Sequence, residues 1–528
     1  MTLHCSERSF SVGSVAPADR RRSLPGRLAE YVRANALLPA VLLVAVATLF
    51  RAQGTVDSDV AWQLWIARHL QSGAVLYRDI VETNPPLWFW MGVPVDWVAR
   101  HLLVRPESAL MAALAGLTML SASVLNRLIN DVAPGRRCFL VTAAAAAMLL
   151  IPWTDAGQRE QIVLIGAIPY AALIAARRNN HPVPLWLAAL IGAAGGLCFA
   201  LKHYFLIVPA LLELWLLANL TRRWRPLRAE TLGMVAVGAA YAVAMIIFAP
   251  AFFTKILPML RLAYGATGAP AIRYLFQPAL VAALLTLAVV VAQARSLLSP
   301  KMAFAAAMFI TSLGFAAAYF IQFKGWPYHA IPVVGSALLC LAAFVTGSSP
   351  NWLKLAAPAL LALPFGISLD TSLRAASYSN HELELAVSGL RPGDGVGFIA
   401  EDSAAAWSVT LQHRLRYASR YNGFWMLRAV AANELKQRPD PRLAALGRSV
   451  VEQTIVDFRC IGPKRIIFVH LANRSADSLD LPAFFRRDPQ FAQLMSHYRR
   501  INPPSPVEVY ELSTPLPHND QDHCRSGV

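Results

Sequence analysis

Charged side chains and cysteines are both scarce in this sequence. Only 15% of its 528 residues are charged, whereas 56% are hydrophobic. The six cysteines show no C-x-x-C spacing, which excludes a cysteine metal cluster. The sequence also lacks an internal repeat and the glycine-rich loops G-x-G-x-x-G and G-x-x-x-x-G-K-[ST], so no nucleotide is bound in the familiar ways.

The cysteines have two different settings. Cys138, Cys198 and Cys340 lie in or beside apolar segments, where a thiol is typically a small packed hydrophobe. Cys460 and Cys524 lie in the more polar last part of the chain and could pair in an oxidising compartment. The sequence alone does not establish this disulfide.

Long apolar runs dominate the rest of the chain, and its mean hydropathy is +0.45. About 20 apolar residues span a bilayer as a helix, so the pattern indicates a polytopic α-helical membrane protein. We expect about eleven transmembrane helices, near 34–50, 108–126, 138–152, 161–176, 184–200, 204–220, 231–250, 278–292, 302–321, 329–347 and 354–369. No A-x-A cleavage site follows the first run before Asp57, so we interpret that run as an uncleaved helix rather than a signal peptide.

The basic residues predict how the helices are oriented. The net charge is +17, but Lys and Arg occur in short clusters between apolar runs, which favours cytoplasmic loops and argues against nucleic-acid binding. With eleven crossings and a cytoplasmic basic tail at 1–33, all these clusters face inward: Arg127, Arg136 and Arg137; Arg177 and Arg178; Arg222, Arg223, Arg225 and Arg228; Arg295 and Lys301; and Lys354. The segment 86–104, with Pro86, Pro94 and Asp96, then has to be an interfacial or re-entrant helix on the outer face.

The composition changes after about Asp370. Short β-branched runs at 396–399, 465–469 and 507–510 alternate with helical stretches at 425–448 and 483–498, which is typical of a small α/β domain. An odd number of crossings places this domain, residues 371–528, outside the cytoplasm. Residues 34–370 form the transmembrane domain, with a first outer loop at 51–107.

The same parity gathers polar residues at the outer face. Polar groups at membrane depth are costly and usually line a functional cavity, so these outer loops form the candidate site. Its members are Asp57, Asp59, Asp79, Glu82, Asp155, Arg159, Lys202, His203, Tyr204, Lys324, Tyr328 and His329.

The first outer loop carries a family resemblance. An Asp-x-Asp, Asp57 to Asp59, follows the first apolar run, and an aromatic stretch and the segment from Leu76 to Trp88 with its Asn-Pro-Pro come next. This pattern resembles the GT-C glycosyltransferases, more narrowly glycosyltransferase family 39, which contains protein O-mannosyltransferases and the lipid A aminoarabinose transferase. The segments 157–160, 201–204 and 324–332 also look like stretches of bacterial members, so the resemblance covers about residues 35–370.

The resemblance implies a multi-span helical fold, a lipid-phosphate sugar donor and a catalytic carboxylate in the first outer loop. Asp57 matches the family's first-loop Asp and is assigned the role of general base, which an inverting transfer needs. Asp59 replaces the more usual Glu of an acidic pair. It could cap a helix or could join Asp57 at a Mg²⁺ or Mn²⁺ ion. For Asp57 itself the alternative is an interfacial helix cap.

The sequence also leaves two roles open for each of the other candidate site residues. Glu82 precedes Asn-Pro-Pro and either positions the acceptor or base or is structural, whereas Asp79 could be salt-bridged to Arg78 or Arg68. A departing phosphate needs cations, and the plausible contacts are Arg159, Lys202, Lys324, His203 and His329, with Tyr204 and Tyr328 as hydroxyl donors. Each basic residue alone could instead extend its charge to the interface.

These patterns together predict an integral membrane glycosyltransferase. It would move a sugar from a polyprenyl-phosphate donor to a lipid, glycan or protein acceptor at the outer face of the cytoplasmic, or inner, membrane of a cell with an envelope. The first alternative is a transporter or flippase of lipid-linked sugars, for which midplane breaks and inverted repeats are expected but not visible. A non-enzymatic envelope scaffold would not explain the acidic first loop.

Overall fold

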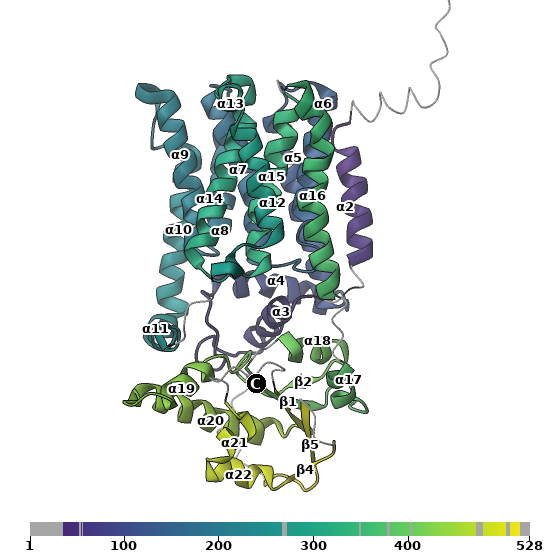
Figure 1. Cartoon of the computed structure of the whole chain (residues 1–528), viewed down its shortest axis with the longest axis vertical. Coiled ribbons are helices and arrows are strands. Elements are labelled where there is room, and N and C mark those ends of the chain that lie inside the picture. Colours follow the sequence, from purple (N-terminus) through teal and green to yellow (C-terminus); the bar gives the residue numbers. More distant parts are fainter. Residues whose placement is uncertain are drawn as a thin grey trace, which may run out of the picture.

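A bundle of long helices carries a smaller α/β domain at one end (Figure 1). The computed structural model describes residues 35–51, 54, 56–266, 272–347, 350–376, 381–401, 404–470, 479–502 and 507–517. The helices of the bundle are α2 (Leu38–Arg51), α5 (Pro106–Leu128), α6 (Pro134–Leu149), α7 (Arg159–Arg178), α8 (Leu185–Phe199), α9 (Ile207–Leu220), α10 (Ala229–Phe248), α12 (Pro278–Val291), α14 (Ala303–Gln322), α15 (Ile331–Val345) and α16 (Asn351–Ala376).

Each of the eleven expected apolar segments coincides with one of these helices. Seven stretches are long and apolar enough to cross a membrane: Pro106–Leu128, Arg159–Arg178, His203–Arg223, Ala229–Phe248, Pro300–Gln322, Pro327–Val345 and Asn351–Asp370. Three shorter apolar helices, α2, α8 and α12, join them, while α6 belongs to neither group. The multi-span helical class is therefore confirmed, and the count of eleven crossings stays a prediction.

The center of the bundle is α7, which is buried along its whole apolar stretch. It packs against α5, α8, α14 and α15, so its side chains meet protein rather than lipid. The outermost position belongs to α10, whose apolar stretch is only 6% buried. An apolar helix surface that is this exposed is stable only where lipid covers it.

Glycines allow α10 to approach α8 very closely. A Cβ built on Gly192 of α8 would lie 2.0 Å from the backbone oxygen of Glu230, and one on Gly233 of α10 would lie 2.4 Å from the backbone oxygen of Ala189. Small residues at such contacts let the backbones of membrane helices pack by van der Waals attraction.

We therefore expect Gly192→Ala to lower the stability of the protein by about 1–3 kcal/mol, the usual cost of overpacking, because backbone and not a flexible side chain must move. The melting temperature in detergent measures this. Gly238→Ala on α10 is the matched control, since a Cβ there meets no atom within 4 Å. Equal melting temperatures for the two variants would contradict this packing argument.

Two short amphipathic helices lie at the end of the bundle that faces the α/β domain (Figure 1). These are α3 (Ser58–Gln71) and α4 (Leu87–His101), and α11 (Leu257–Ala266) lies at the same end. Arg68 of α3 and Asp96 of α4 form an ion pair at 3.0 Å, and Gln71 donates to the same carboxylate. The predicted interfacial segment 86–104 is thus α4 and the turn after it, and α4 is not among the helices suited to span a membrane.

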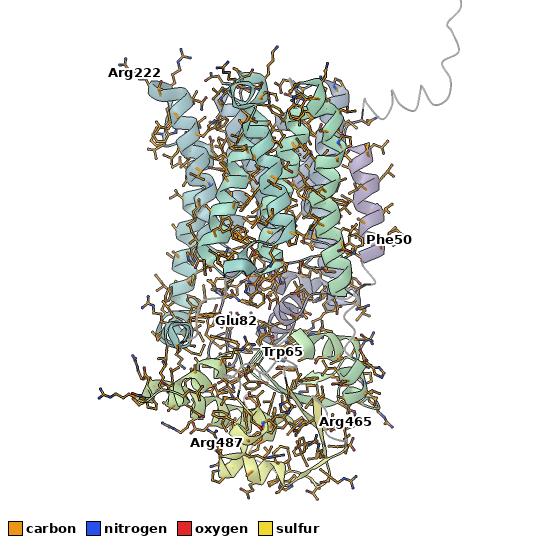
Figure 2. The ribbon with its side chains drawn as sticks, in the orientation of Figure 1. Phe50, Trp65, Glu82, Arg222, Arg465 and Arg487 are labelled. Carbon is orange, nitrogen blue, oxygen red and sulfur yellow. The ribbon has the colours of Figure 1, made fainter. Side chains whose placement is uncertain are left out.

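The acidic loop and the basic clusters lie at opposite ends of the bundle. Figure 2 places Glu82 and Trp65 between the bundle and the α/β domain, and Arg222 at the far end. Arg177 and Arg228 at that far end both pair with the buried Glu230. The two ends therefore differ in charge as the loop parity predicts, and which end faces the cytoplasm stays a prediction.

The C-terminal domain is built on a five-stranded mixed sheet in the order β2-β1-β3-β5-β4. The strands are β1 (Gly395–Ala400), β2 (Arg416–Tyr417), β3 (Arg465–Val469), β4 (Tyr498–Arg500) and β5 (Val507–Leu512), and the helices are α17 (His381–Val387), α18 (Ala404–Gln412), α19 (Leu427–Glu434), α20 (Pro441–Ile461), α21 (Leu481–Arg486) and α22 (Pro489–Met495). Strand β1 is parallel to β2 and β3, whereas β5 runs antiparallel to β3 and β4. Both faces of β1 are covered, as its apolar run predicts.

The α/β prediction is confirmed with two corrections. The helical stretches 425–448 and 483–498 are each split, because Asp440 and Asp488 cap new helices whose first residues are Pro441 and Pro489. The helix α16 also continues past Asp370 to Ala376. Cys138, Cys198 and Cys340 are free thiols, as expected, and Cys524 lies outside the described residues.

Candidate active site

The candidate site lies where five loops and turns meet at the end of the bundle next to the C-terminal domain. The loops are 56–59 before α3, 72–86 between α3 and α4, 150–158 before α7, and the turns that contain the short 3₁₀ helices η1 (His203–Leu206) and η6 (Pro327–Ala330). Buried α7 begins at this end, so its first residues, Arg159 and Glu160, are the deepest polar groups of the site. Gln158, Arg159, Glu160 and His329 are all 4% exposed or less.

Asp57 caps α3 and also contacts α7. Its Oδ1 accepts hydrogen bonds from the backbone N–H of Asp59 at 2.9 Å and from Nε2 of Gln158 at 2.8 Å. Asp59 lies in the first turn of α3, so the expectation that it could be the cap is wrong, because the cap is Asp57. Oδ2 of Asp59 accepts from Nε2 of Gln158 at 3.5 Å and from the hydroxyl of Tyr328 at 3.4 Å.

The environment of Asp57 makes it a candidate base as well as a cap. Burial, followed by the negative charge of Asp59, raises the pKa of Asp57 to about 7. Burial also raises the pKa of Asp155 to about 8, with Asp57 and Glu160 adding to the effect and Arg51 opposing it. Carboxylates whose pKa lies near neutrality can both accept and return a proton at physiological pH.

Glu82 is buried, and both oxygens of its carboxylate accept hydrogen bonds. Its Oε2 accepts from the indole N–H of Trp62 at 2.6 Å. Its Oε1 accepts from the backbone N–H groups of Thr83 and Asn84, both at 2.7 Å, and from Nδ2 of Asn84 at 2.8 Å. Burial raises the pKa of Glu82, while these donors and the nearby Arg159 oppose that rise.

Arg159 is linked to Glu82 through Asn84. One end of the guanidinium donates to Oδ1 of Asn84, and its carbon lies 4.7 Å from the ring center of Trp88. Gly157, with φ +97°, precedes this residue, and its carbonyl accepts from the Trp88 indole at 3.1 Å. Nε of Arg159 is buried and has no hydrogen-bond partner among the described residues. A buried unpaired donor on a cation is what an anionic ligand would satisfy.

Lys202 lies in a second polar group next to Arg159. Its Nζ contacts Oε1 of Glu160 at 2.5 Å, Oε1 of Gln322 at 3.2 Å and Nε2 of His329 at 3.0 Å. Burial lowers the pKa of Lys202 to about 8, and Glu160 opposes this effect. Among the described residues, Oε2 of Glu160 and Nδ1 of His329 are buried without a partner.

Four of the predicted site residues lie at the margin of this cluster. Lys324 is exposed and donates to the hydroxyl of Tyr264 at 3.3 Å. His203 is exposed, and its ring is tilted against that of Tyr204 with 3.8 Å between the ring centers. Asp79 pairs with Arg78 at 2.9 Å and accepts from the backbone N–H of Val75, which is the structural alternative expected for it.

Sequence reasoning missed three residues that connect the site. Asn84 joins Glu82 to Arg159, Gln158 joins Asp57 to Asp59, and Glu160 pairs with Lys202. Each of the three has at least one partner from a distant part of the chain. Only Asn84, directly before two prolines, carried a local signal, because such a segment has a restricted backbone.

Asp57 and Asp59 offer the oxygen ligands that a divalent cation prefers. No group of three or more His, Cys, Asp or Glu side chains suited to a metal occurs within the described ranges. Asp57 and Asp59 do share the amide of Gln158, whose Oε1 is buried without a partner in the same part of the chain. Two carboxylates and an amide oxygen are ligands that Mg²⁺ accepts when substrate phosphate and water complete its octahedron.

Neither a protein-family model nor a curated protein sequence matches this chain. Among solved structures, it is similar to ArnT from Cupriavidus metallidurans bound to undecaprenyl phosphate, with a TM-score of 0.53 and 12% identity over 92% of this chain and 98% of that one. The apo oligosaccharyltransferase of Archaeoglobus fulgidus has a TM-score of 0.46 and 10% identity, with 83% of this chain and 70% of that one covered. The likeness to ArnT covers most of both chains, so this chain shares the fold of that protein, and the predicted resemblance is confirmed at the level of the fold.

Proposed function

We propose that this protein is a membrane glycosyltransferase that uses a polyprenyl-phosphate-linked sugar as its donor. The observation that carries the proposal is the half-buried Asp57, whose pKa of about 7 suits a general base and which lies in the same loop cluster as the buried Arg159 and the half-buried Lys202. The undecaprenyl phosphate bound to the structurally similar ArnT supports the donor class. The acceptor is a lipid, glycan or protein at the outer face of the cytoplasmic membrane.

The proposed reaction is an inverting displacement. Asp57 takes the proton of an acceptor hydroxyl, whose oxygen forms a bond to the anomeric carbon of the sugar. The bond between that carbon and the phosphate oxygen breaks, and its electron pair leaves with the polyprenyl phosphate. Arg159 stabilises the phosphate charge through its unpaired Nε, and Lys202 contributes from its pair with Glu160. Glu82 keeps Arg159 in place through Asn84.

A divalent cation would be held by the carboxylates of Asp57 and Asp59, in place of the Gln158 amide N–H that both accept from. When bound, Mg²⁺ or Mn²⁺ neutralises charge on phosphate oxygens. Chelation and re-addition of metal, with the melting temperature in detergent as readout, tests binding independently of transfer: a rise on metal addition that is lost in Asp59→Asn supports the site.

The direct test is transfer by the purified protein. Detergent-solubilised protein is incubated with polyprenyl-phosphate sugars carrying a labelled sugar and with an envelope extract, and release of free polyprenyl phosphate is measured alongside the labelled product. Mass spectrometry of envelope glycans and glycolipids from a deletion strain then identifies the acceptor. Movement of intact lipid-linked sugar across proteoliposomes without release of polyprenyl phosphate would instead favour the transporter alternative.

The proposed orientation has its own test. With the N-terminus in the cytoplasm and α4 at the outer surface, reporter fusions after Arg105 and after Asp370 are both expected to report an extracytoplasmic location. A fusion after Arg178 is the control, because the basic end of α7 is expected in the cytoplasm. A cytoplasmic signal at Arg105 with the Asp370 fusion unchanged would contradict the scheme.

A further inference from the structure

Four aromatic side chains connect the first outer loop to the C-terminal domain. We call them the interdomain aromatic cluster: Trp62 and Trp65 of α3, Trp407 of α18 and Tyr417 of β2. The ring of Trp62 stacks on Trp65 at 4.7 Å and lies 5.3 Å from Trp407, which in turn lies 4.7 Å from Tyr417. Trp62, Trp407 and Tyr417 are at most 1% exposed, so this contact is as dry as a protein core.

The cluster is held in place from the C-terminal side. The indole N–H of Trp407 donates to Oδ1 of Asn422 at 2.7 Å, and the hydroxyl of Tyr417 donates to the carbonyl of Tyr421 at 2.9 Å. Each polar end is therefore fixed by the loop after β2. The rings of both residues have no freedom to leave Trp62 without breaking these bonds.

The same loop also holds the backbone next to Glu82. The N–H of Val81 donates to the carbonyl of Arg420 at 2.9 Å, and Val81 and Tyr421 form an isolated parallel bridge. Arg420 in turn binds the buried Asp457 of α20, at 2.7 Å for its closest contact. The C-terminal domain thus contacts both the backbone that precedes Glu82 and the indole that binds its carboxylate.

We propose that Trp62 is a positioning residue for Glu82 and that the C-terminal domain completes the active site by fixing Trp62 through Trp407 and Tyr417. This inference rests on the proposed function, because it assigns Glu82 to the catalytic cluster. Without the domain, the Trp62 indole would be free to rotate and Oε2 of Glu82 would lose its one side-chain donor from α3. Oε1 would keep its bonds to Thr83 and Asn84, so the Oε2 end of the carboxylate is the part that would lose its fixed position.

The proposal predicts how Glu82 titrates. The groups that face Glu82 are Arg159 from α7, whose charge favours the carboxylate, and Tyr77 from the same loop, whose pKa is raised by burial and by Glu82. The Trp62 N–H also favours the carboxylate, because it binds the ionised form more strongly than the neutral acid. Its removal therefore shifts the protonation of Glu82 to higher pH.

The experiment measures this titration by infrared spectroscopy on the full-length protein, with the carboxyl band of Glu82 assigned by its disappearance in Glu82→Gln. Trp62→Phe keeps an aromatic ring in the cluster and removes the N–H, and Trp407→Leu removes the support from the C-terminal domain. Both are expected to keep Glu82 protonated to higher pH than in the wild type and to reduce transfer by about 10- to 100-fold, the effect of losing a buried bond to a charged group. Trp407→Phe is expected to restore much of the loss.

Trp425→Leu is the matched control for a lost contact between domains. Trp425 stacks on Tyr264 of α11 at 4.9 Å, away from Glu82, so its variant should leave the titration and the pH profile unchanged. An unchanged Glu82 titration in Trp407→Leu would overturn the role of the C-terminal domain, and an unchanged one in Trp62→Phe would overturn the role of Trp62. Shifted titrations in a protein whose wild type transfers no sugar would support the positioning contacts and reject the proposed function.

Discussion

Asp57→Asn is expected to lower sugar transfer by a factor on the order of 10²–10⁴, the contribution of a positioned general base. Asn keeps the size of the side chain and caps a helix about as well as Asp, so α3 should still form and the protein should still fold. The bond from the backbone N–H of Asp59 can be kept by the Asn oxygen. Transfer at saturating donor, compared with donor binding and the melting temperature of the same variant, separates lost chemistry from lost structure.

The pH dependence of sugar transfer gives a second expected result for Asp57. Since burial and Asp59 raise the pKa of Asp57 to about 7, this carboxyl is protonated below that pH and cannot accept a proton there. Transfer by the wild type should therefore rise as the pH increases through about 7, and the small residual activity of Asp57→Asn should lack that rise. Near-normal transfer by Asp57→Asn would leave Asp57 as a helix cap only and would return the transporter alternative to first place.

Asp59→Asn is the control that separates the two acids. It removes a negative charge beside Asp57 and should lower the pKa of Asp57, which moves the rise in transfer to lower pH. If the acids share a metal, Asp59→Asn should also lose activity and regain part of it with excess Mn²⁺. If Asp57 acts without a metal, only Asp57→Asn should show the large loss.

Lys202→Met is expected to destabilise the protein by about 3–5 kcal/mol, because it removes one partner of a buried ion pair. Glu160 is 0% exposed and contacts Nζ of Lys202 at 2.5 Å. Without that cation the carboxylate of Glu160 stays buried without a compensating charge. A large fall in the melting temperature in detergent is the expected result.

The double variant Lys202→Met with Glu160→Gln separates stability from donor binding. Removing both charges avoids the uncompensated carboxylate, so much of the stability should return, while binding of polyprenyl phosphate should remain weaker than in the wild type. Lys324→Met is the matched single variant, since Lys324 is exposed and its Nζ contacts only a Tyr264 hydroxyl and ring among the contacts described. Equal stability of Lys202→Met and Lys324→Met would contradict a buried pair at Lys202.

These two lysines show what sequence patterns cannot distinguish. Both precede aromatic residues at the ends of apolar runs, so both were equally plausible phosphate contacts that would tolerate Met without loss of folding. The structure separates them, because Glu160 at the start of α7 reaches Lys202 and not Lys324. Lys202→Met is therefore expected to affect folding, which a local pattern could not reveal.

The sequence by itself determined that the chain is a multi-span helical protein with a C-terminal α/β domain. Three patterns support this: apolar runs of helical length, basic clusters on alternate loops, and a final section of alternating strands and helices. Each depends only on the hydrophobicity and charge of residues close together in the sequence. The first outer loop could also be identified as the center of the site, because acidic residues beside a long apolar run are costly and are usually functional. For the same reason the positions of the eleven helices and of β1, β3 and β5 agree with the sequence pattern.

Only the tertiary structure decided which polar groups meet. Gln158 reaches Asp57 across 101 residues, Lys202 reaches Glu160 across 42, and Trp407 packs on Trp62 from another domain. Such pairs depend on how loops from separate helices converge at the end of the bundle, and no local periodicity encodes that convergence. The burial that raises the pKa of Asp57 toward neutrality arises in the same way, since it depends on neighbours supplied by distant segments rather than on adjacent residues.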